Sequence, residues 1–479
     1  MKISFLLYFF GIVACYTAFP NQHIHIGLFG FFMFVPILLL QNTEHNKKFK
    51  FLITWSFFQT FFIILLWVNP FQFTERFERM GVIFGFIAFY TLLPLLTALL
   101  FEVIFYLFKK NILIASTVWV LFEFIMTKLP YCFPLSIAIT QYNNLSILQI
   151  AGFTGIFGIS FLVILSNLAI SKFFQNKNPH MLILPTILIA SIGLNPFMEN
   201  IFLPSTKQQA VKFALIQPNL SWREAWHAHK SLFLLKNAFH KITGLSAIAK
   251  QDGKKLVYIW PELAASAFNL ESKQLRNILK KLTANQHNLI LGVKGLQGNA
   301  ILSLNNNLEI AGKYQKTKLV PFFETYKYIQ SIYQKPLPII HNSLQVGVFV
   351  CYEMLYPDIS RSLTLSGADF LGGLSFNTWL GNTNWPLLQM AYLPFRAAEN
   401  NRYTFYLNNN GPSGVARPNG KIIEILPLGK KGYILFDAFP INTLSFYSRF
   451  GDIFIYCLIL CLIIYGLKIG GDKLKSNST

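Results

Sequence analysis

The sequence predicts two kinds of structure in one chain, a polytopic α-helical membrane domain and an α/β domain. Hydrophobic residues make up 53% of the 479 residues and charged residues 13%, whereas soluble proteins carry about 25% charged residues. Apolar runs of about 20 residues, the length of a membrane span, fill the chain before residue 200 and return once near its end. Between them, short β-rich runs alternate with polar stretches of helical length, which is typical of layered α/β folds.

Eight apolar runs are long enough to be membrane spans, because about 20 helical residues cross the hydrocarbon core. The first run begins beside Lys2 like a signal peptide, but no clear small-residue cleavage site follows it and further spans come at once. We therefore interpret it as a span. The predicted spans are residues 3–19, 24–40, 51–68, 81–108, 112–128, 148–170, 181–197 and 450–468.

Lysines in alternate short loops predict the orientation of these spans, because cytoplasmic loops carry an excess of Lys and Arg. The other loops are poorer in these residues; the third, for example, offsets Arg76 and Arg79 with two glutamates. We therefore expect a multi-pass membrane protein with both termini cytoplasmic and residues of about 200–448 on the outer face of the membrane. The lysines on the cytoplasmic side are Lys47, Lys48, Lys50, Lys109, Lys110, Lys172, Lys177, Lys468, Lys473 and Lys475.

The charged residues argue for a membrane rather than a nucleic acid as partner. The net charge is +21, but no basic stripe with interleaved aromatic residues is present, so we expect no nucleic-acid binding. Lysines at membrane edges and opposite anionic lipid explain the charge. Glu102 and Glu123 fall inside predicted spans, where a charge costs about 2.5–3.5 kcal/mol. They either contact a lipid head group or the outer domain, or are buried and paired near a span end; we favour burial and pairing.

The predicted outer domain begins near residue 205 and is built from short apolar runs that read as strands. Several runs are almost wholly apolar, as expected of strands that are covered on both faces. We expect three parts, a membrane domain of seven helices (1–200), the outer domain (205–445), and the eighth helix with a cytoplasmic tail (446–479). The predicted strands are 211–217, 255–260, 289–295, 301–305, 346–352, 369–376, 404–410 and 432–437.

Cys351 is the one cysteine of this outer domain, and it stands at the end of an apolar run, directly before Tyr352 and Glu353. The outer face of the membrane is oxidising, so structural cysteines there are usually paired. Cys351 is a nucleophile, an inert buried thiol, or the disulfide partner of Cys132 in the fifth loop. A thiol with a pKa near 8.5 is mostly protonated at neutral pH and needs a base to become a nucleophile.

Two further segments offer the groups that a thiol nucleophile needs. Glu262 follows an apolar run in IWPELAAS, although a glutamate after proline also suits the first turn of a helix. Lys316 and Lys318 precede a second run in YQKTKLVPFFE, which ends at Glu324. A cation stabilises the oxyanion that forms when a carbonyl is attacked. These residues alone do not decide between an oxyanion donor and an ordinary solvated lysine.

Three motifs together resemble a known family. WPE at 260–262, K-x-x-L-V-P-F-x-E at 316–324 and C-Y-E at 351–353 resemble the Glu–Lys–Cys triad of the carbon–nitrogen hydrolase (nitrilase) superfamily. Their order, between the seventh and eighth predicted spans, resembles the membrane branch of that superfamily, the apolipoprotein N-acyltransferases. The segments 408–422 and 448–452 are also similar to that family.

This resemblance implies the fold, the reaction and the residue roles. It implies a nitrilase-like α-β-β-α sandwich on an eight-helix membrane domain, with Glu262 as general base, Lys316 as oxyanion donor and Cys351 as nucleophile. The family reaction transfers an acyl chain from a phospholipid, through a Cys351 thioester, to the α-amine of the N-terminal diacylglyceryl-cysteine of an apolipoprotein, in a ping-pong cycle with no cofactor or metal. The residues implied to support the triad or to bind substrate are Glu324, Tyr352, Glu353 and Trp222.

Two alternatives and two departures from the family pattern remain. A membrane-tethered amidase or nitrilase would use the same triad with water as acceptor, and a transporter or lipoprotein-binding module would use no catalysis. Phe323 replaces the glycine of the usual LVPFGE motif. In SFNTWL, Phe376 and Asn377 stand at the Asn and Asp positions of the usual S-N-D-A-W-F. Neither departure changes a triad residue, but both concern loops that admit a donor or an acceptor.

Overall fold

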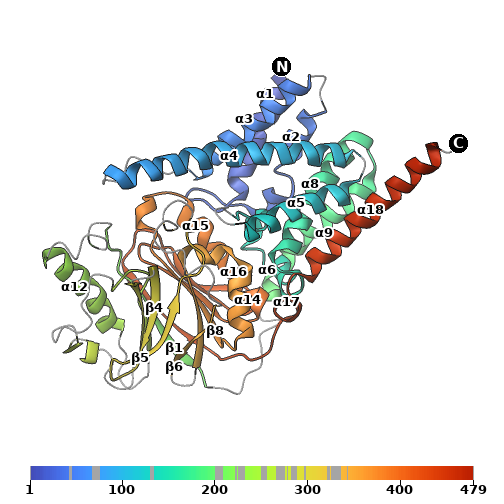
Figure 1. Ribbon diagram of the computed structural model, residues 1–479. Helices are drawn as coiled ribbons and strands as arrows, with labels where there is room; N and C mark the ends of the chain where they lie inside the picture. The colour runs from blue at the N-terminus through green and yellow to red at the C-terminus, as the bar shows by residue number, and fades with distance from the viewer. Residues whose placement is uncertain are drawn as a thin grey trace. The chain divides into compact units, whose positions relative to one another are not determined.

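The computed structural model of this protein divides into two compact units (Figure 1). The first contains residues 1–67, 86–196 and 450–479, and the second contains residues 68–85 and 197–449. The structure describes residues 2–42, 46–66, 76–109, 111–129, 134–199, 209–221, 224, 232–249, 256–265, 276–277, 279–281, 288–295, 298–320, 324, 336–341 and 344–477. Trp222, Phe323 and Cys132, which the sequence singled out, lie outside these residues.

Helices make up the described chain up to residue 199 and its C-terminal end. Their apolar residues are spread around the helix circumference, as in helices that lie in lipid or in the interior of a bundle. The elements are α1 (Lys2–Ala18), η1 (Gly27–Phe31), α2 (Val35–Leu40), α3 (Lys47–Leu66), α4 (Arg76–Phe108), α5 (Ile112–Lys128), η3 (Ile137–Gln141), α6 (Leu145–Leu148), α7 (Ala151–Thr154), α8 (Ile156–Asn176), η4 (Pro179–Leu182), α9 (Ile183–Ser191), η5 (Ile192–Leu194), α10 (Asn195–Met198) and α18 (Ile453–Asn477).

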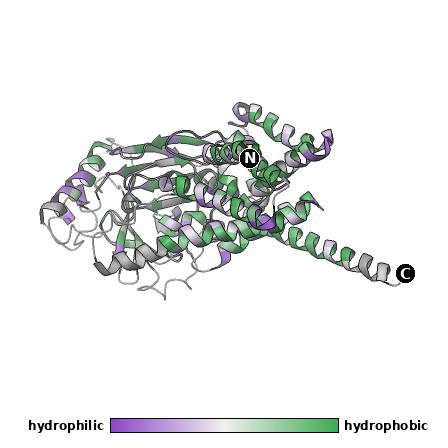
Figure 2. Cartoon of the chain, turned by 90° about the horizontal axis from the view of Figure 1, so that it is seen from above, coloured by the Kyte–Doolittle hydropathy of each residue, from purple (hydrophilic) through white to green (hydrophobic). Residues whose placement is uncertain are grey.

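Five of the described helical stretches are long and apolar enough to cross a membrane. Figure 2 shows hydrophobic residues along α18, which has the highest mean hydropathy of the five. The region is therefore helical and apolar as predicted, while the count of eight spans stays a prediction. The five stretches are Lys47–Leu66, Phe89–Leu107, Ile156–Asn176, Pro179–Met198 and Ile453–Gly470.

The predicted span at 24–40 is not one continuous helix, because it is interrupted between η1 and α2. Asn167 on α8 bonds to the backbone at the interruption. Its Nδ2 donates to the Gly30 carbonyl oxygen at 2.8 Å, and its Oδ1 accepts from the Phe34 backbone N–H at 2.7 Å. An unsatisfied backbone group in lipid costs several kcal/mol. One fully buried side chain thus makes the break in the helix tolerable.

Glu123 on α5 is a buried carboxylate with internal donors. Oε1 accepts from Trp119 Nε1 at 2.8 Å and from the Ile137 backbone N–H at 3.0 Å. Oε2 accepts from the hydroxyls of Ser136 at 2.8 Å and Ser160 at 2.6 Å. Burial and internal pairing, which we favoured for this residue, is therefore confirmed. Glu102 likewise accepts an internal hydrogen bond, from Gln41 Nε2 at 2.9 Å.

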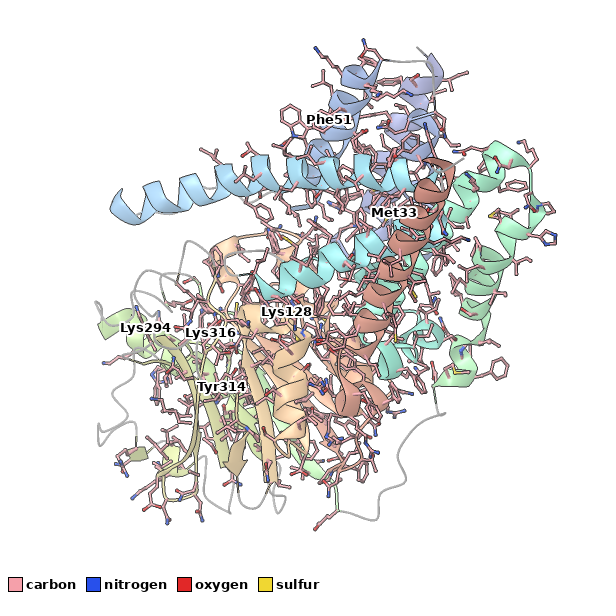
Figure 3. The ribbon with its side chains drawn as sticks, turned by 45° about the vertical axis from the view of Figure 1, so that its right-hand side comes forward. Met33, Phe51, Lys128, Lys294, Tyr314 and Lys316 are labelled. Carbon is pink, nitrogen blue, oxygen red and sulfur yellow. The ribbon has the colours of Figure 1, made fainter. Side chains whose placement is uncertain are left out.

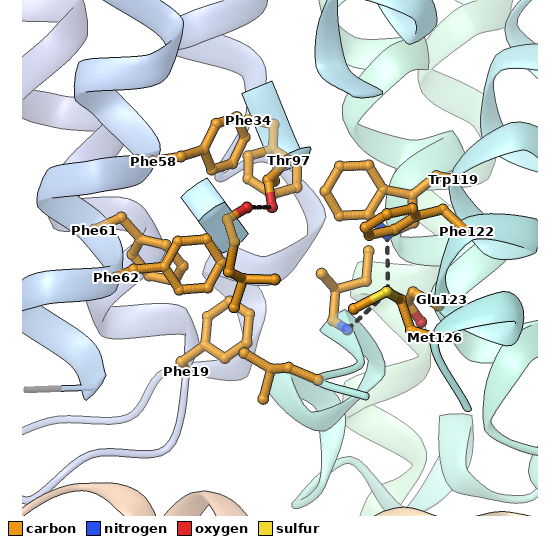
Figure 4. A pocket seen from close by; sticks show the side chains of 13 residues that line it. Phe19, Phe34, Phe58, Phe61, Phe62, Thr97, Trp119, Phe122, Glu123 and Met126 are labelled. Carbon is orange, nitrogen blue, oxygen red and sulfur yellow. Dashed lines mark hydrogen bonds between the residues drawn. The ribbon is translucent and has the colours of Figure 1, made fainter. Parts of the chain in front are cut away.

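A cavity of about 50 Å³ lies beside Glu123 in this unit (Figure 4). The polar side chains in its wall are hydrogen-bonded within the protein. The hydrogen bonds of Glu123 are described above, and the Thr97 hydroxyl donates to the Leu93 carbonyl oxygen at 2.8 Å. The cavity is therefore apolar, with room on the order of one or two water-sized groups. Its lining residues are Phe19, Phe34, Phe58, Phe61, Phe62, Leu93, Thr97, Trp119, Phe122, Glu123, Met126, Leu135 and Ile137.

The second unit contains two six-stranded sheets, with the strand orders β12-β1-β2-β3-β4-β5 and β11-β10-β9-β8-β7-β6. The strands β1–β2–β3 and β7–β8–β9 run parallel in the middle of each sheet, and the other pairs are antiparallel. The strands are β1 (Val211–Gln217), β2 (Val257–Ile259), β3 (Asn288–Gly295), β4 (Gly298–Leu304), β5 (Ile310–Gln315), β6 (Ile339–His341), β7 (Leu344–Val350), β8 (Phe370–Ser375), β9 (Thr404–Asn408), β10 (Ser413–Ala416), β11 (Ile422–Leu426) and β12 (Gly432–Ala438).

The two sheets pack face to face, with helices on their outer faces. Phe213 on β1 contacts Phe370 on β8 and Phe405 on β9, with ring centroids 5.1 and 5.9 Å apart. Helix α12 (Leu232–Ala249) packs on the first sheet, and α14 (Pro357–Leu365) and α16 (Leu393–Asn400) pack on the second. The order of layers is therefore α-β-β-α, and the nitrilase-like sandwich that the resemblance implied is confirmed.

Candidate active site

Cys351 stands where β7 ends and a short helix, η9 (Cys351–Leu355), begins. β7 lies between β6 and β8, so a paired strand fixes the backbone that carries the thiol. The residue is 6% exposed and has a φ of +52°. A non-glycine residue in this left-handed region stores roughly 1–3 kcal/mol of strain and persists only where its surroundings impose it. In the described part of the chain, Cys351 is a free thiol.

Glu262 follows β2, whose carboxyl end faces the same site. Its side chain is almost fully buried, and its Oε1 accepts from Asn299 Nδ2 at 2.6 Å. The negative charge of this carboxyl group also acts on the nearby Cys351 thiol and raises its pKa. Gly292 on β3 permits the arrangement, because a Cβ at that position would lie 2.5 Å from the Glu262 Cα. The acid therefore sits directly beside the thiol.

Lys316 directly follows β5, two residues after Tyr314 (Figure 3). Its side chain is 1% exposed. Nζ lies 2.9 Å from Glu324 Oε1 and 3.5 Å from Glu262 Oε1. Asn299 Nδ2 joins the same two carboxylates, at 2.6 Å from Glu262 and 3.2 Å from Glu324. The Lys316 ammonium group is thus held between the carboxylates of Glu262 and Glu324.

Glu353 ties the lysine segment to the cysteine segment through five hydrogen bonds. Oε1 accepts from the Thr317 backbone N–H at 2.6 Å, the Thr317 hydroxyl at 2.7 Å and the Lys318 backbone N–H at 3.0 Å. Oε2 accepts from the Val350 backbone N–H at 2.7 Å and the Tyr314 hydroxyl at 2.8 Å. This buried carboxylate therefore fixes the residues on either side of the site relative to one another.

Burial sets the protonation states of the site. Burial raises the pKa of the Cys351 thiol to about 12, and the negative charge of Glu262 adds to this while Lys316 opposes it. Burial also raises the pKa of the Glu262 carboxyl group above its ordinary value. For Lys316, burial lowers the pKa, but the charges of Glu324 and Glu262 outweigh it and the net pKa is raised. The resting site therefore contains a neutral thiol, a cation and an acid of raised pKa.

The remaining predicted residues divide between the site and its surroundings. Glu324 belongs to the site through Lys316, and its Oε2 accepts from the Val320 backbone N–H at 2.8 Å. The Tyr352 hydroxyl accepts from the Tyr356 hydroxyl at 3.1 Å, and the two rings pack edge to face. Asn299 could not be predicted from the sequence, because an isolated asparagine in a β-rich run belongs to no recognisable motif. The segments that follow β2, β5 and β7 thus bring an acid, a cation and a thiol together.

Two family models match the chain. The apolipoprotein N-acyltransferase N-terminal domain matches residues 11–169, and the carbon–nitrogen hydrolase domain matches residues 213–440. The apolipoprotein N-acyltransferase of Wigglesworthia glossinidia brevipalpis is 26% identical over 476 residues, which covers 92% of each chain. That of Borreliella burgdorferi is 24% identical and covers 97% of this chain and 95% of its own.

Solved structures are similar to about half of the chain. An amidase from Nesterenkonia sp. is 19% identical, with a TM-score of 0.36, over 51% of this chain and 95% of its own. A member of branch 10 of the nitrilase superfamily from Saccharomyces cerevisiae is 22% identical, with a TM-score of 0.37, over 52% of this chain and 96% of its own. The two matching family models follow one another along the chain and agree with full-length relatives. The chain belongs to the apolipoprotein N-acyltransferase family.

Proposed function

We propose that this protein transfers a fatty-acyl chain from a phospholipid to the α-amine of the N-terminal diacylglyceryl-cysteine of apolipoproteins, through a thioester on Cys351. The relatives that span nearly the whole chain are named apolipoprotein N-acyltransferases. These names and the matching N-terminal domain support N-acylation of lipoproteins over the alternative of an amidase that uses water. The observation that carries the mechanism is the buried Cys351 thiol, which interacts electrostatically with the Glu262 carboxyl group and the Lys316 ammonium group, themselves 3.5 Å apart.

In the first half-reaction, Glu262 takes the thiol proton while Sγ attacks the ester carbonyl carbon of the phospholipid. A thiol with a pKa of about 12 is not ionised at neutral pH, so it needs this base. Lys316 and backbone N–H groups stabilise the oxyanion. The ester C–O bond then breaks, Glu262 returns the proton to the leaving oxygen, and a lysophospholipid departs.

In the second half-reaction, the α-amine of the acceptor attacks the thioester carbonyl carbon. The C–S bond breaks and an amide forms. Glu262 takes one amine proton and passes it to the Cys351 sulfur, which restores the thiol. The two half-reactions exchange only an acyl group and protons, so the proposal requires no cofactor or metal.

The apolar helices suit substrates of this kind. Burial of an acyl chain contributes about 0.8 kcal/mol per CH₂, so drawing a sixteen-carbon chain into water costs on the order of 12 kcal/mol. An enzyme that joins two lipids therefore works at the bilayer surface. The lysine distribution supports cytoplasmic termini and a periplasmic catalytic domain in a bacterial inner membrane. We propose the same boundaries as above, 1–200, 205–445 and 446–479.

The mass of the intact protein tests this proposal. Purified full-length protein is incubated with a phospholipid that carries a labelled acyl chain, without acceptor, and is then weighed and mapped. One acyl mass on Cys351, absent from Cys351→Ala and released by a diacylated lipopeptide, is the expected result. No adduct on folded protein rejects the thioester route, and release to water at the same rate without acceptor favours the amidase.

A further inference from the structure

Asn377 lies beside the nucleophile, on the polypeptide that leaves the end of β8. Its Oδ1 is 3.6 Å from the Cys351 sulfur, which donates to it, and 3.0 Å from the Ser375 hydroxyl, which also donates to it. The side chain is 1% exposed. This oxygen therefore faces the reacting atom from within the protein.

Three hydrogen bonds fix the orientation of Asn377. Its Nδ2 donates to Gln389 Oε1 at 2.6 Å and to the Tyr406 hydroxyl at 3.2 Å. Its backbone N–H donates to Asn408 Oδ1 at 3.1 Å. Since the amide nitrogen is held on the side away from the thiol, the amide oxygen is held toward Cys351.

Two groups that act on the thiol thus differ in their chemistry. Glu262 can accept a hydrogen bond and also take up a proton. Asn377 can only accept a hydrogen bond, because a carboxamide is not basic at neutral pH. When the sulfur becomes a thioester it has no proton left to donate. Asn377 Oδ1 then loses one of its two donors at the place where the second substrate must arrive.

We propose that Asn377 orients the attacking amine in the second half-reaction by accepting one of its two N–H groups. This inference rests on the function proposed above. The amine nitrogen bonds to the thioester carbon, and the C–S bond breaks. One amine proton goes to Glu262 and then to the Cys351 sulfur. The other stays on nitrogen, bonded to Asn377 Oδ1, and remains as the N–H of the product amide.

The test measures the two half-reactions separately on full-length protein in lipid nanodiscs. Acylation of Cys351 by a labelled phospholipid is followed by mass, and transfer is followed after addition of a diacylated lipopeptide. Asn377→Ala is expected to slow transfer at least tenfold more than it slows acylation. Asn377→Asp, which keeps an acceptor oxygen, is expected to restore most of the difference. Asn409→Ala is the matched control, because that buried side chain bonds to Leu220 and Thr378 instead of Cys351.

A second acyl acceptor gives a ratio of two transfer rates within each variant, and this ratio does not depend on how much of the variant is folded. The same lipopeptide with an N-methylated α-amine has one N–H group to share between Glu262 and Asn377. We expect the wild-type protein to transfer to it at least tenfold more slowly than to the primary amine, and we expect this ratio to shrink in Asn377→Ala. Equal wild-type rates for both acceptors, or an unchanged ratio in Asn377→Ala, overturn the role of Asn377. Absence of the acyl-enzyme in wild-type protein instead overturns the proposed function.

Discussion

Glu353→Gln tests whether one buried carboxylate holds the site together. The best orientation of glutamine leaves its oxygen facing the three donors of Thr317 and Lys318, and lets the Tyr314 hydroxyl turn to accept from the new NH₂ group. The Val350 N–H then has no acceptor. A buried donor without a partner costs about 1–3 kcal/mol, and each of the three remaining bonds loses about 1 kcal/mol with the charge. The sum is on the order of 4–6 kcal/mol, a large share of the stability of an ordinary domain.

The same change is expected to slow acylation, because Val350 directly precedes Cys351. A misplacement of about 1 Å at a reacting group costs about 100-fold in rate. We expect Glu353→Gln to melt well below the wild-type protein in detergent and to form the Cys351 acyl adduct about 100-fold more slowly. The matched control is Glu424→Gln, since Glu424 is exposed on β11. If Glu353→Gln melts and acylates like this control, the reasoning is refuted.

Three further changes test other parts of the structure. Lys316→Met leaves the buried carboxylate of Glu262 and the partly exposed carboxylate of Glu324 without their cation. We expect a loss of about 3–5 kcal/mol in thermal unfolding and no acyl adduct; wild-type acylation would contradict this. The pKa of Cys351 is about 12 in the folded protein against an ordinary 9.0, so the unfolded thiol ionises first and stability falls as pH rises between these values. Between pH 8 and 12 the free energy of unfolding of the wild-type protein should fall by up to about 4 kcal/mol more than that of Cys351→Ser. If the free energy of unfolding depends on pH in the same way in both proteins, the raised pKa of Cys351 is contradicted. In Gly372→Ala the new Cβ would lie 2.1 Å from the Phe405 ring, so we expect about 1–3 kcal/mol of destabilisation. Gly244→Ala, inside α12, has open space around it and should instead stabilise the protein by about 0.5–1 kcal/mol.

The central strands were predictable because both of their faces are covered. The runs at 211–217 and 369–376 are almost wholly apolar, and they correspond to β1 and β8, whose residues are mostly buried. β5 and β11 were missed, since each has exposed residues that break the apolar pattern. β10 was missed because its four residues are too few to show a pattern. What decides these strands is pairing with a neighbour, and local sequence does not contain that information.

The site was predictable where its residues belong to motifs and hidden where they meet through the fold. Glu262, Lys316 and Cys351 stand in recognisable segments, and the structure brings them together. Asn299 is 37 residues from Glu262 and reaches it only because β3 and β4 form a hairpin. Asn377 was named as a departure from the family pattern, but its place beside the thiol follows from the parallel pairing of β7 with β8.

The interruption near the start of the chain has a consequence for biosynthesis. The Phe34 backbone N–H has no acceptor until Asn167 is synthesised, 133 residues later. At about 5–20 residues per second this delay is roughly 7–27 s. During that interval the second apolar segment has backbone groups that lipid cannot satisfy. A ribosome-bound chain that stops before α8 should therefore hold this segment in the aqueous part of the translocation machinery or at the head groups, and its arrival in the hydrocarbon core should coincide with that of α8.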